Sequence, residues 1–336
     1  MRAWRELAGR ELAGRELAGR ELAGGSGVSW PGGPVTVRVP ATSANLGPGF
    51  DSFGLALSLF DVVTARVTPD GVTIEVTGTG TAAASAGGQH LVIRAMRTAF
   101  AATGAQPPGI ALSSVNAIPQ GFGLGSSAGA IVAGILAARA LAGDAGAAAL
   151  PDDAVLRMAT RLEGHPDNVA ACLAGGLTIA WDPGAGTGAR VARLAPLPQI
   201  APVLCVPDQP LATVTARKVL PAEIPLAAAA ANSARTALLV AALTSQPDLL
   251  MAGTEDFLHQ RYRAAAMPAT ASLIARLRAA GIPAVVSGAG PSVLAFALDG
   301  TGAGDAGVAA VAAADGAAWQ VLPLRVDTCG ATVQAR

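Results

Sequence analysis

The feature that most constrains this sequence is a glycine-rich turn that leads into an alanine-rich helix. Residues 118–130 read IPQGFGLGSSAGA, with Gly121, Gly123 and Gly125 at alternate positions. Such glycines can adopt positive φ and let a ligand approach the backbone closely. The helix predicted over residues 126–141 would point its free N–H groups and the positive end of its dipole at that ligand. The spacing therefore predicts a phosphate site, although a glycine turn with a serine N-cap would show the same spacing.

The turn matches neither of two common nucleotide-binding motifs. No Lys-Ser or Lys-Thr pair follows the glycines, as a Walker A loop requires, and Ser126 stands where the last glycine of G-x-G-x-x-G should be. A dinucleotide-dependent dehydrogenase needs a strand–GxGxxG–helix unit, which the sequence lacks. The phosphate site would thus belong to a different class of protein.

Length and composition favour two domains of the α+β class. The chain has 336 residues, of which 51% are hydrophobic and 4% aromatic, so its core must consist mainly of Ala, Val, Leu and Ile. Strand-like and helix-like stretches alternate without a strict βαβ rhythm, which indicates α+β architecture. A flexible turn at residues 182–190 suggests a boundary near residue 195. We therefore expect domains at residues 34–194 and 195–336.

Hydrophobic periodicity and turn residues predict the individual elements. Asp152 is the candidate N-cap of one helix, and residues 69–71 (Pro-Asp-Gly) form the turn between two strands. The predicted strands cover residues 35–39, 59–67, 72–76, 110–115, 175–181, 202–206, 284–287 and 293–298. The predicted helices cover residues 90–103, 126–141, 152–162, 226–243 and 271–280.

The N-terminal segment stands apart, because residues 5–24 read RELAG four times in succession. A period of five fits neither a helix nor a strand, and glycine recurs in every repeat. We expect residues 1–33 to be a low-complexity, disordered appendage that ends in a linker. A helix that binds a partner is the alternative.

Charge and cysteine content exclude several classes of protein. Lys plus Arg and Asp plus Glu both number 23, and no basic stripe is present, so nucleic acid is not an expected partner. Cys172, Cys205 and Cys329 are too scattered for a disulfide framework or a zinc site. No apolar stretch reaches the length of a membrane span, and no signal-peptide pattern is visible. A cytoplasmic protein without a membrane partner is therefore expected.

Three further segments combine glycine or proline with side chains suited to chemistry. Residues 40–57 place Asn45 and Asp51 after a strand, where the carboxylate could hold an ammonium group; an Asx-type turn is the alternative. The glutamate of the EGHPDN loop, residues 163–168, offers the oxygen ligands that Mg²⁺ prefers. The SGAGPS segment at residues 287–292 is either a tight turn between two strands or part of a site.

Taken together, the glycine-rich turn and these three segments resemble the motifs of the GHMP kinase family. The resemblance covers about residues 35–330. ATSANLGPGFD at residues 41–51, EGHPDN at 163–168 and HQRYR at 259–263 are most similar to members that act on homoserine. The resemblance implies a two-domain α+β fold, with a ribosomal-S5-like N-terminal domain, a ferredoxin-like C-terminal domain and the active site between them.

The resemblance also implies a reaction, the ATP-dependent phosphorylation of homoserine to O-phosphohomoserine on the route to threonine, with Mg²⁺ as the metal. Planar guanidinium groups suit the substrate carboxylate, and a carboxylate suits its ammonium group. By motif, ATP would be bound by Pro119, Gly121, Gly123, Leu124, Gly125, Ser126, Ser127 and Ala128; homoserine by Asn45, Asp51, Asn168, Arg217, Arg263 and Gly288; and Mg²⁺ by Ser126 and Glu163. Asn168 and Glu163 would be the catalytic residues, and a homodimer is left open.

Two positions depart from the family pattern. Asn168 occupies a place where some relatives have an aspartate with a lysine beside it, so we expect catalysis by positioning without a side-chain base. Gly129 stands where a second Ala or Ser is expected, which weakens the first helical turn by roughly 1 kcal/mol relative to alanine. The phosphate cradle, made by backbone groups, should be unaffected.

Two alternatives share much of this pattern. A family member acting on another hydroxyl, such as that of mevalonate, would leave Asp51 without an ammonium partner. A non-catalytic regulator that binds nucleotide or amino acid would bind ATP without releasing ADP when homoserine is present. The presence of every candidate metal and substrate residue argues against such a regulator.

We expect removal of residues 1–33 to leave catalytic activity intact, because the repeat lies outside the segments that carry chemistry. The measurement is ADP release by the full chain and by a chain that begins at residue 34. A large loss in the shorter chain would contradict the interpretation of the repeat as an appendage.

Overall fold

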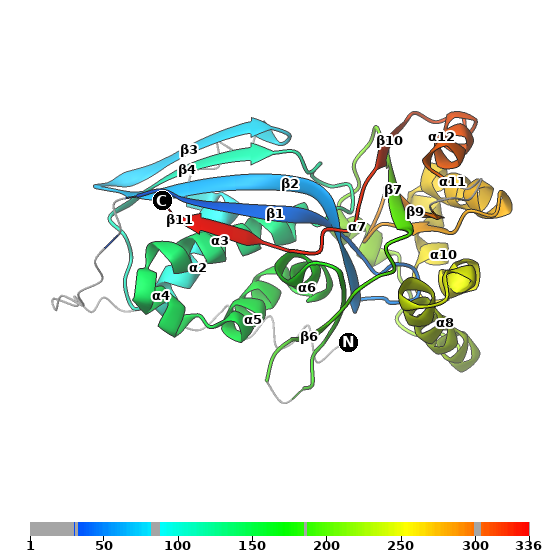
Figure 1. Ribbon diagram of the computed structural model, residues 1–336, viewed down its shortest axis with the longest axis horizontal. Coiled ribbons are helices and arrows are strands. Elements are labelled where there is room, and N and C mark those ends of the chain that lie inside the picture. Colours follow the sequence, from blue (N-terminus) through cyan, green and yellow to red (C-terminus); the bar gives the residue numbers. More distant parts are fainter. Residues whose placement is uncertain (1–29, 31–32, 82–87, 185–186, 299–303, 336) are drawn as a thin grey trace.

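The computed structural model describes residues 30, 33–81, 88–184, 187–298 and 304–335. The RELAG repeat and most of the linker predicted at residues 1–33 therefore lie outside the described residues. The described chain forms two α+β halves that lie side by side, each built on its own sheet (Figure 1). The α+β class expected from the sequence is confirmed.

The first half contains a seven-stranded sheet. Its main path runs β11-β1-β2-β4-β3, and β5 pairs with both β2 and β6. The last strand of the chain therefore returns to the first sheet, antiparallel to β1. The strands are β1 (Val35–Ala44), β2 (Phe53–Thr68), β3 (Gly71–Gly78), β4 (Gly109–Asn116), β5 (Leu177–Trp181), β6 (Arg190–Leu194) and β11 (Thr332–Ala335).

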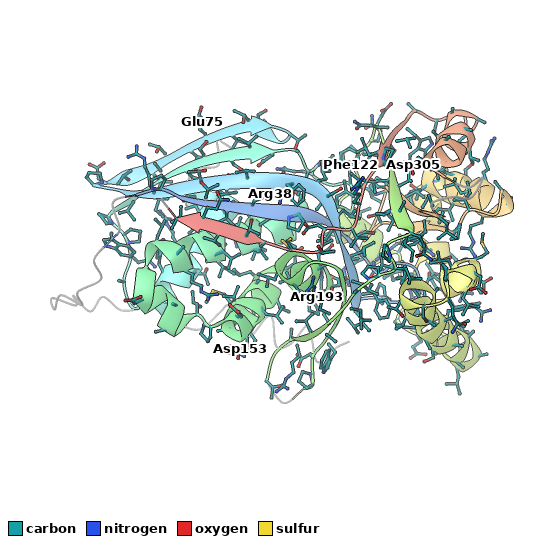
Figure 2. All side chains as sticks on the ribbon, viewed as in Figure 1. Arg38, Glu75, Phe122, Asp153, Arg193 and Asp305 are labelled. Carbon is teal, nitrogen blue, oxygen red and sulfur yellow. The ribbon has the colours of Figure 1, made fainter. Side chains whose placement is uncertain are left out.

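Helices cover one face of this sheet (Figure 1). They are α2 (Leu91–Ala102), α3 (Ser126–Leu141), α4 (Gly143–Ala149), α5 (Asp152–Glu163) and α6 (Asp167–Ala174). Strand β3 shows the expected alternation, since Val72 and Ile74 pack toward the helices while Glu75 is exposed on the open face (Figure 2). Helix α3 is apolar on all sides, and it is correspondingly buried among its neighbours.

The second half contains a four-stranded sheet in the order β10-β7-β9-β8, with helices on both faces. On one face, α11 and α12 pack against alternate residues of β7 and β9. On the other face, α8 shares a hydrophobic cluster with residues of the first half such as Leu46 and Leu55, so the two halves have a common core. The strands are β7 (Ile200–Pro207), β8 (Ala284–Val286), β9 (Val293–Leu298) and β10 (Trp319–Pro323); the helices are α7 (Thr213–Lys218), α8 (Leu226–Thr244), α9 (Leu250–Gly253), α10 (Gln260–Arg263), α11 (Pro268–Ala279) and α12 (Asp305–Ala313).

Helix α8 corrects one expectation from the sequence. With 19 residues and a mean hydropathy of 1.5, it is long and apolar enough to span a bilayer by length and composition alone. Two of its polar residues nevertheless contact other parts of the protein. Asn232 donates to the Pro48 carbonyl, and Arg235 pairs with Glu255. These contacts fasten α8 to the rest of the molecule.

Three local predictions also differ from the structure. The strands on either side of the Pro-Asp-Gly turn at residues 69–71 are not neighbours, because β4 lies between β2 and β3. Asp152 is the first residue of α5 and pairs with Arg139, while Pro151 occupies the N-cap. A serine does not cap α3 either, since Gly125, at φ 67°, holds the N-cap position.

Two glycines of α3 should respond in opposite ways to replacement by alanine. A Cβ at Gly129 would only touch Val39 at 3.5 Å, so Gly129→Ala should raise the free energy of unfolding by about 1 kcal/mol through helix propensity. A Cβ at Gly134 would lie 2.5 Å from the Val92 carbonyl oxygen of α2. Gly134→Ala should therefore lower the free energy of unfolding by about 1–3 kcal/mol. Urea unfolding of both variants is the measurement, and changes of the same sign would contradict this packing.

Candidate functional site

The four predicted motifs meet in a small cavity of about 100 Å³ between the two halves. It is bounded by the end of β1, the glycine-rich turn, the EGHPDN loop, helices α7 and α10 and the SGAGPS loop. The lining residues are Ala44, Asn45, Pro119, Gly121, Gly123, Leu124, Gly125, Ser126, Ser127, Glu163, His165, Asp167, Asn168, Thr213, Arg217, Arg263, Gly288 and Ala289.

The glycine-rich turn uses its glycines as the sequence predicts. Gly121, Gly123 and Gly125 all have positive φ, between 67° and 83°. At Gly125 a Cβ would lie 1.9 Å from the Thr42 hydroxyl, so only glycine fits. In the described structure, the N–H groups of residues 125–128 donate no hydrogen bond to a protein group. They form a row of donors without a protein partner at the positive end of α3, hereafter the N–H row, which suits an anion.

The EGHPDN loop places two polar side chains at the rim of this row. Glu163 accepts a hydrogen bond from the Ser127 hydroxyl at 2.7 Å through Oε2. Asn168 accepts one from the Thr42 hydroxyl at 2.7 Å through Oδ1. This contact orients the Asn168 amide so that its NH₂ group is free to donate to a ligand in the cavity.

Asp167 and His165 of the EGHPDN loop form a second pair of polar side chains, to which the sequence analysis assigned no role. Asp167 is 2% exposed, and its Oδ1 accepts the backbone N–H of Asn168 and lies 3.2 Å from Nδ1 of His165. Burial lowers the pKa of His165, but the hydrogen bond and the charge of Asp167 outweigh burial and raise this pKa overall. The pair thus braces the loop that carries Asn168.

The loop after β1 holds a strained backbone. Asn45, Leu46 and Asp51 have positive φ of 68°, 51° and 55°, which non-glycine residues rarely adopt. Asn45 stabilises this shape, because its Oδ1 accepts the Asp51 N–H and its Nδ2 donates to the Gly288 carbonyl at 2.7 Å. One Nδ2 hydrogen of Asn45 is left for a ligand.

Two arginines bring positive charge to the cavity. Arg217 forms a double hydrogen bond with the Asp51 carboxylate, at 2.6 and 3.2 Å. Arg263 is 1% exposed, and it has no carboxylate partner within 4 Å in the part of the chain that the structure describes. Burial, together with the charge of Arg217, lowers the pKa of Arg263 to about 10. An anion bound in this cavity would offset both the cost of burying the Arg263 charge and the repulsion between the two cations.

A second cavity of about 370 Å³ adjoins the glycine-rich turn on its other side, and it shares Gly121, Ser126 and Ser127 with the first. Asp61, on β2, projects into it and accepts the N–H groups of Ala117 and Ile118. Burial raises the pKa of Asp61, although these two hydrogen bonds lower it.

The same cavity contains a histidine with a free ring nitrogen. His90 precedes α2 and is 8% exposed, and its Nδ1 has no partner among the described residues. Burial lowers the pKa of His90. Sequence reasoning missed both Asp61 and His90. An acid within the apolar strand LFDVV was the available signal for Asp61, and the histidine had none.

Most residues predicted for the site lie together. Asn45, Glu163, Asn168, Arg217, Arg263 and Gly288 all line the first cavity, as do seven of the eight residues predicted to bind phosphate. Ala128 is the eighth; it is fully buried in α3, so its backbone N–H is its only polar group directed at the turn. Asp51 does not line the cavity and reaches it through Arg217. Their assigned roles stay predictions.

Comparisons with known proteins agree with this geometry. The sequence model of the GHMP kinase N terminal domain matches residues 90–176, and that of the GHMP kinase C terminal matches residues 236–315. A homoserine kinase from Streptomyces coelicolor is 52% identical over 301 residues, covering 89% of this chain and 94% of that protein. A homoserine kinase from Leifsonia xyli is 48% identical over 300 residues, covering 89% and 91%.

Solved structures show the same fold. The homoserine kinase from Cytophaga hutchinsonii superposes with a TM-score of 0.76 at 27% identity, covering 90% of this chain and 97% of that one. The mevalonate kinase of L. major, in complex with R-mevalonate, has a TM-score of 0.64 at 15% identity, covering 87% and 95%, which shows the fold alone. With these matches along nearly all of its described length, the chain belongs to the GHMP kinase family.

Proposed function

We propose that this chain is an enzyme that transfers the terminal phosphoryl group of ATP to the hydroxyl of L-homoserine, forming O-phospho-L-homoserine in threonine biosynthesis. One observation carries the proposal. The buried Arg263 guanidinium, without a carboxylate partner among the described residues, faces the same cavity as the free N–H row at the start of α3. Two anions, a carboxylate and a phosphate, would therefore lie on opposite sides of one small space. The 52% identity to a homoserine kinase supports homoserine as the substrate.

The two adjoining cavities would bind different parts of ATP. The N–H row of residues 125–128 would hold the phosphates, because backbone donors at a helix N-terminus bind anions of any shape. The second cavity, with the free Nδ1 of His90, has the volume to hold the nucleoside. The shared lining of Ser126 and Ser127 joins the two binding regions.

Mg²⁺ fits the residues at this junction. Ser126 and Glu163 offer hard oxygen atoms, and Oε1 of Glu163 has no hydrogen bond within the described residues. Among the described residues, no three His, Cys, Asp or Glu side chains are placed so that together they could hold a metal ion. Mg²⁺ is commonly bound by one or two protein oxygens together with substrate phosphates, so few protein ligands are enough. When bound, the ion would neutralise charge on the transferred phosphoryl group.

The ion pair between Asp51 and Arg217 is complementary to an amino acid. A zwitterion offers Asp51 an ammonium group and offers Arg217 and Arg263 a carboxylate. Binding would thus replace the partly exposed Asp51–Arg217 ion pair by two ion pairs with the ligand, one from Asp51 to the ammonium group and one from Arg217 to the carboxylate. The same carboxylate would also neutralise Arg263. A substrate without an ammonium group, such as mevalonate, would leave Asp51 with no new partner.

Phosphoryl transfer would depend on alignment. The Asn168 amide, oriented by Thr42, would donate to the reacting hydroxyl or to the transferred group. The nearby Asp167 carboxylate is already engaged by His165 and by the Asn168 backbone, which supports a bracing role for it. A cytoplasmic location is part of the proposal, and three cysteines without a disulfide support it.

Asp51→Asn should raise the KM for homoserine roughly tenfold or more, since it removes a charge-assisted hydrogen bond to the ammonium group and releases Arg217. The KM for ATP should not change. Coupled ADP detection with homoserine and mevalonate is the measurement, and Glu223→Gln, which removes an exposed carboxylate elsewhere, is the control. Faster turnover of mevalonate than of homoserine by the unmodified chain would overturn the substrate assignment.

Asn168→Ala should lower kcat by roughly 100-fold, because a misplaced hydroxyl loses its alignment with the phosphoryl group. The KM for ATP should stay close to that of the unmodified chain, because the N–H row does not depend on this side chain. Steady-state kinetics at saturating ATP is the measurement. Unchanged turnover would remove Asn168 from the mechanism.

A further inference from the structure

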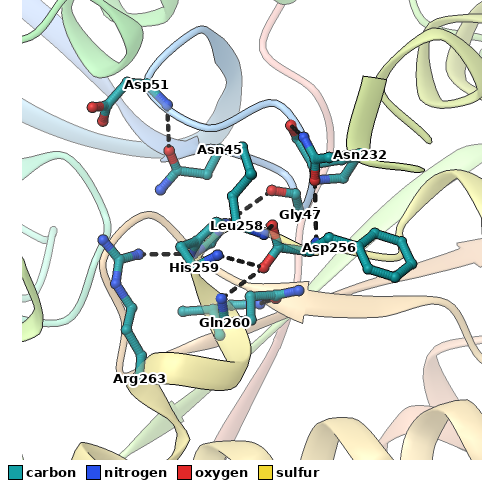
Figure 3. Close-up of polar contacts among 12 residues, drawn as sticks. Asn45, Gly47, Asp51, Asn232, Asp256, Leu258, His259, Gln260 and Arg263 are labelled. Carbon is teal, nitrogen blue, oxygen red and sulfur yellow. Dashed lines mark hydrogen bonds and ion pairs between the residues drawn. The ribbon is translucent and has the colours of Figure 1, made fainter. Parts of the chain in front are cut away.

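A buried histidine, His259, lies behind the proposed substrate site and contacts Arg263. Its side chain is 0% exposed and lies just before α10, whose last residue is Arg263. Nδ1 of His259 is 3.0 Å from Nη1 of Arg263, and Nε2 is 2.9 Å from the Gly47 carbonyl oxygen (Figure 3). Both ring nitrogens therefore have partners, one from each half of the molecule.

The chemistry of these partners fixes the state of the ring. A carbonyl oxygen can only accept, so Nε2 must carry the hydrogen that it donates to Gly47. An arginine can only donate, so Nδ1 must keep its lone pair and accept from Arg263. His259 is thus the neutral Nε2–H tautomer. Burial lowers the pKa of His259 to about 4, with the charge of Asp256 acting in the opposite direction and that of Arg263 in the same one.

Neighbouring groups hold the ring in place without competing for its nitrogens. The Asp256 carboxylate lies 3.8 Å from Nε2, but it already accepts the backbone N–H groups of Leu258, His259 and Gln260. Phe50 stacks against the imidazole, with ring centroids 5.2 Å apart and an interplanar angle of 29°. The ring is therefore fixed in position, in orientation and in tautomer.

The contacts of Arg263 leave one edge of its guanidinium open. Nε donates to the Ala216 carbonyl, and Nη1 donates to His259 and to the Gly288 carbonyl at 3.2 Å. Within the described residues Nη2 has no hydrogen-bond partner, and Arg263 lines the substrate cavity. Two of the groups that hold Arg263 also bind the loop carrying Asp51: the His259 ring through the Gly47 carbonyl, and the Gly288 carbonyl through the Asn45 amide.

We propose that His259 is a positioning residue that aims the free edge of Arg263 at the substrate carboxylate and sets its distance from the loop that binds the ammonium group. This proposal rests on the proposed function, in which Arg263 binds the carboxylate of homoserine. His259 itself does not touch the substrate. Its hydrogen bond to Nη1 restricts rotation of the guanidinium group. Nη2 therefore keeps its position and direction in the cavity.

Two substitutions separate the two hydrogen bonds of the ring. A glutamine amide reaches the place of Nε2, so His259→Gln keeps a donor for Gly47 and removes the acceptor for Arg263. An asparagine amide reaches the place of Nδ1, so His259→Asn keeps an acceptor for Arg263 and removes the donor for Gly47. The two variants have similar polarity, and both lose the stacking of the imidazole ring on Phe50. They are therefore matched controls for each other.

The test compares homoserine with 2-amino-1,4-butanediol, which has the ammonium and hydroxyl groups but no carboxylate. We expect His259→Gln to lower kcat/KM for homoserine about tenfold to a hundredfold, the usual effect of a lost hydrogen bond to a charged group. We expect little change for the diol, and a smaller loss for homoserine in His259→Asn. The KM for ATP should be unchanged in both variants. The ratio of kcat/KM for homoserine to kcat/KM for the diol does not depend on the fraction of molecules that fold, so a poor yield does not obscure the comparison.

Two outcomes contradict the proposal. An equal loss on homoserine and on the diol would mean that His259 only fills the core. A larger loss in His259→Asn than in His259→Gln would mean that the Gly47 contact, and not Arg263, is what matters. Failure of the proposed function looks different, because the unmodified chain would then show no preference for homoserine over the diol.

Discussion

The site depends on a set of hydrogen bonds that join the SGAGPS loop of the second half to two segments of the first. The Ser287 hydroxyl donates to the Gly123 carbonyl, the Gly288 N–H to the Ala44 carbonyl, and the Asn45 amide to the Gly288 carbonyl. The contact is close enough that a Cβ at Gly123 would lie 2.2 Å from the Ser287 carbonyl oxygen. Glycine at this position is therefore required by packing between the halves as well as by the turn itself. Without this contact the N–H row of residues 125–128 and the two arginines would not line one cavity.

Burial of charge is the second constraint on the site. The interior around Arg263 engages Nε and Nη1 of its guanidinium with carbonyl groups and a neutral imidazole, but among the described residues it supplies no partner for Nη2 and no carboxylate. The cost of burying that charge is offset only when an anion enters the cavity. Asp51 pairs with Arg217 and not with Arg263.

Local sequence predicted the bounds of helices and strands better than it predicted which strands pair. The helices predicted from the alanine-rich stretches at residues 126–141 and 226–243 match α3 and α8 almost to the residue. The sequence could not predict that β4 lies between β2 and β3, or that Thr332–Ala335 pairs with β1. Strand partners are chosen by long-range packing, and the Pro-Asp-Gly turn only ends one strand and begins the next. The prediction that Asp152 is an N-cap was wrong, and here too a partner distant in the sequence matters: the Asp152 carboxylate pairs with Arg139 of another helix.

By itself the sequence determined the pieces of chemistry: glycines where the backbone must adopt positive φ, a helix start that offers free N–H groups, and acidic, amide and guanidinium groups in separate motifs. These follow from local stereochemistry and from residue type, so they are present in the linear chain. Only the tertiary structure decided that Asp51 pairs with Arg217 and not with Arg263, and that His259, which contacts Arg263, also contacts Gly47, 212 residues before it in the chain. Burial and partnership depend on which distant segments meet, and that is a property of the packed core rather than of any segment.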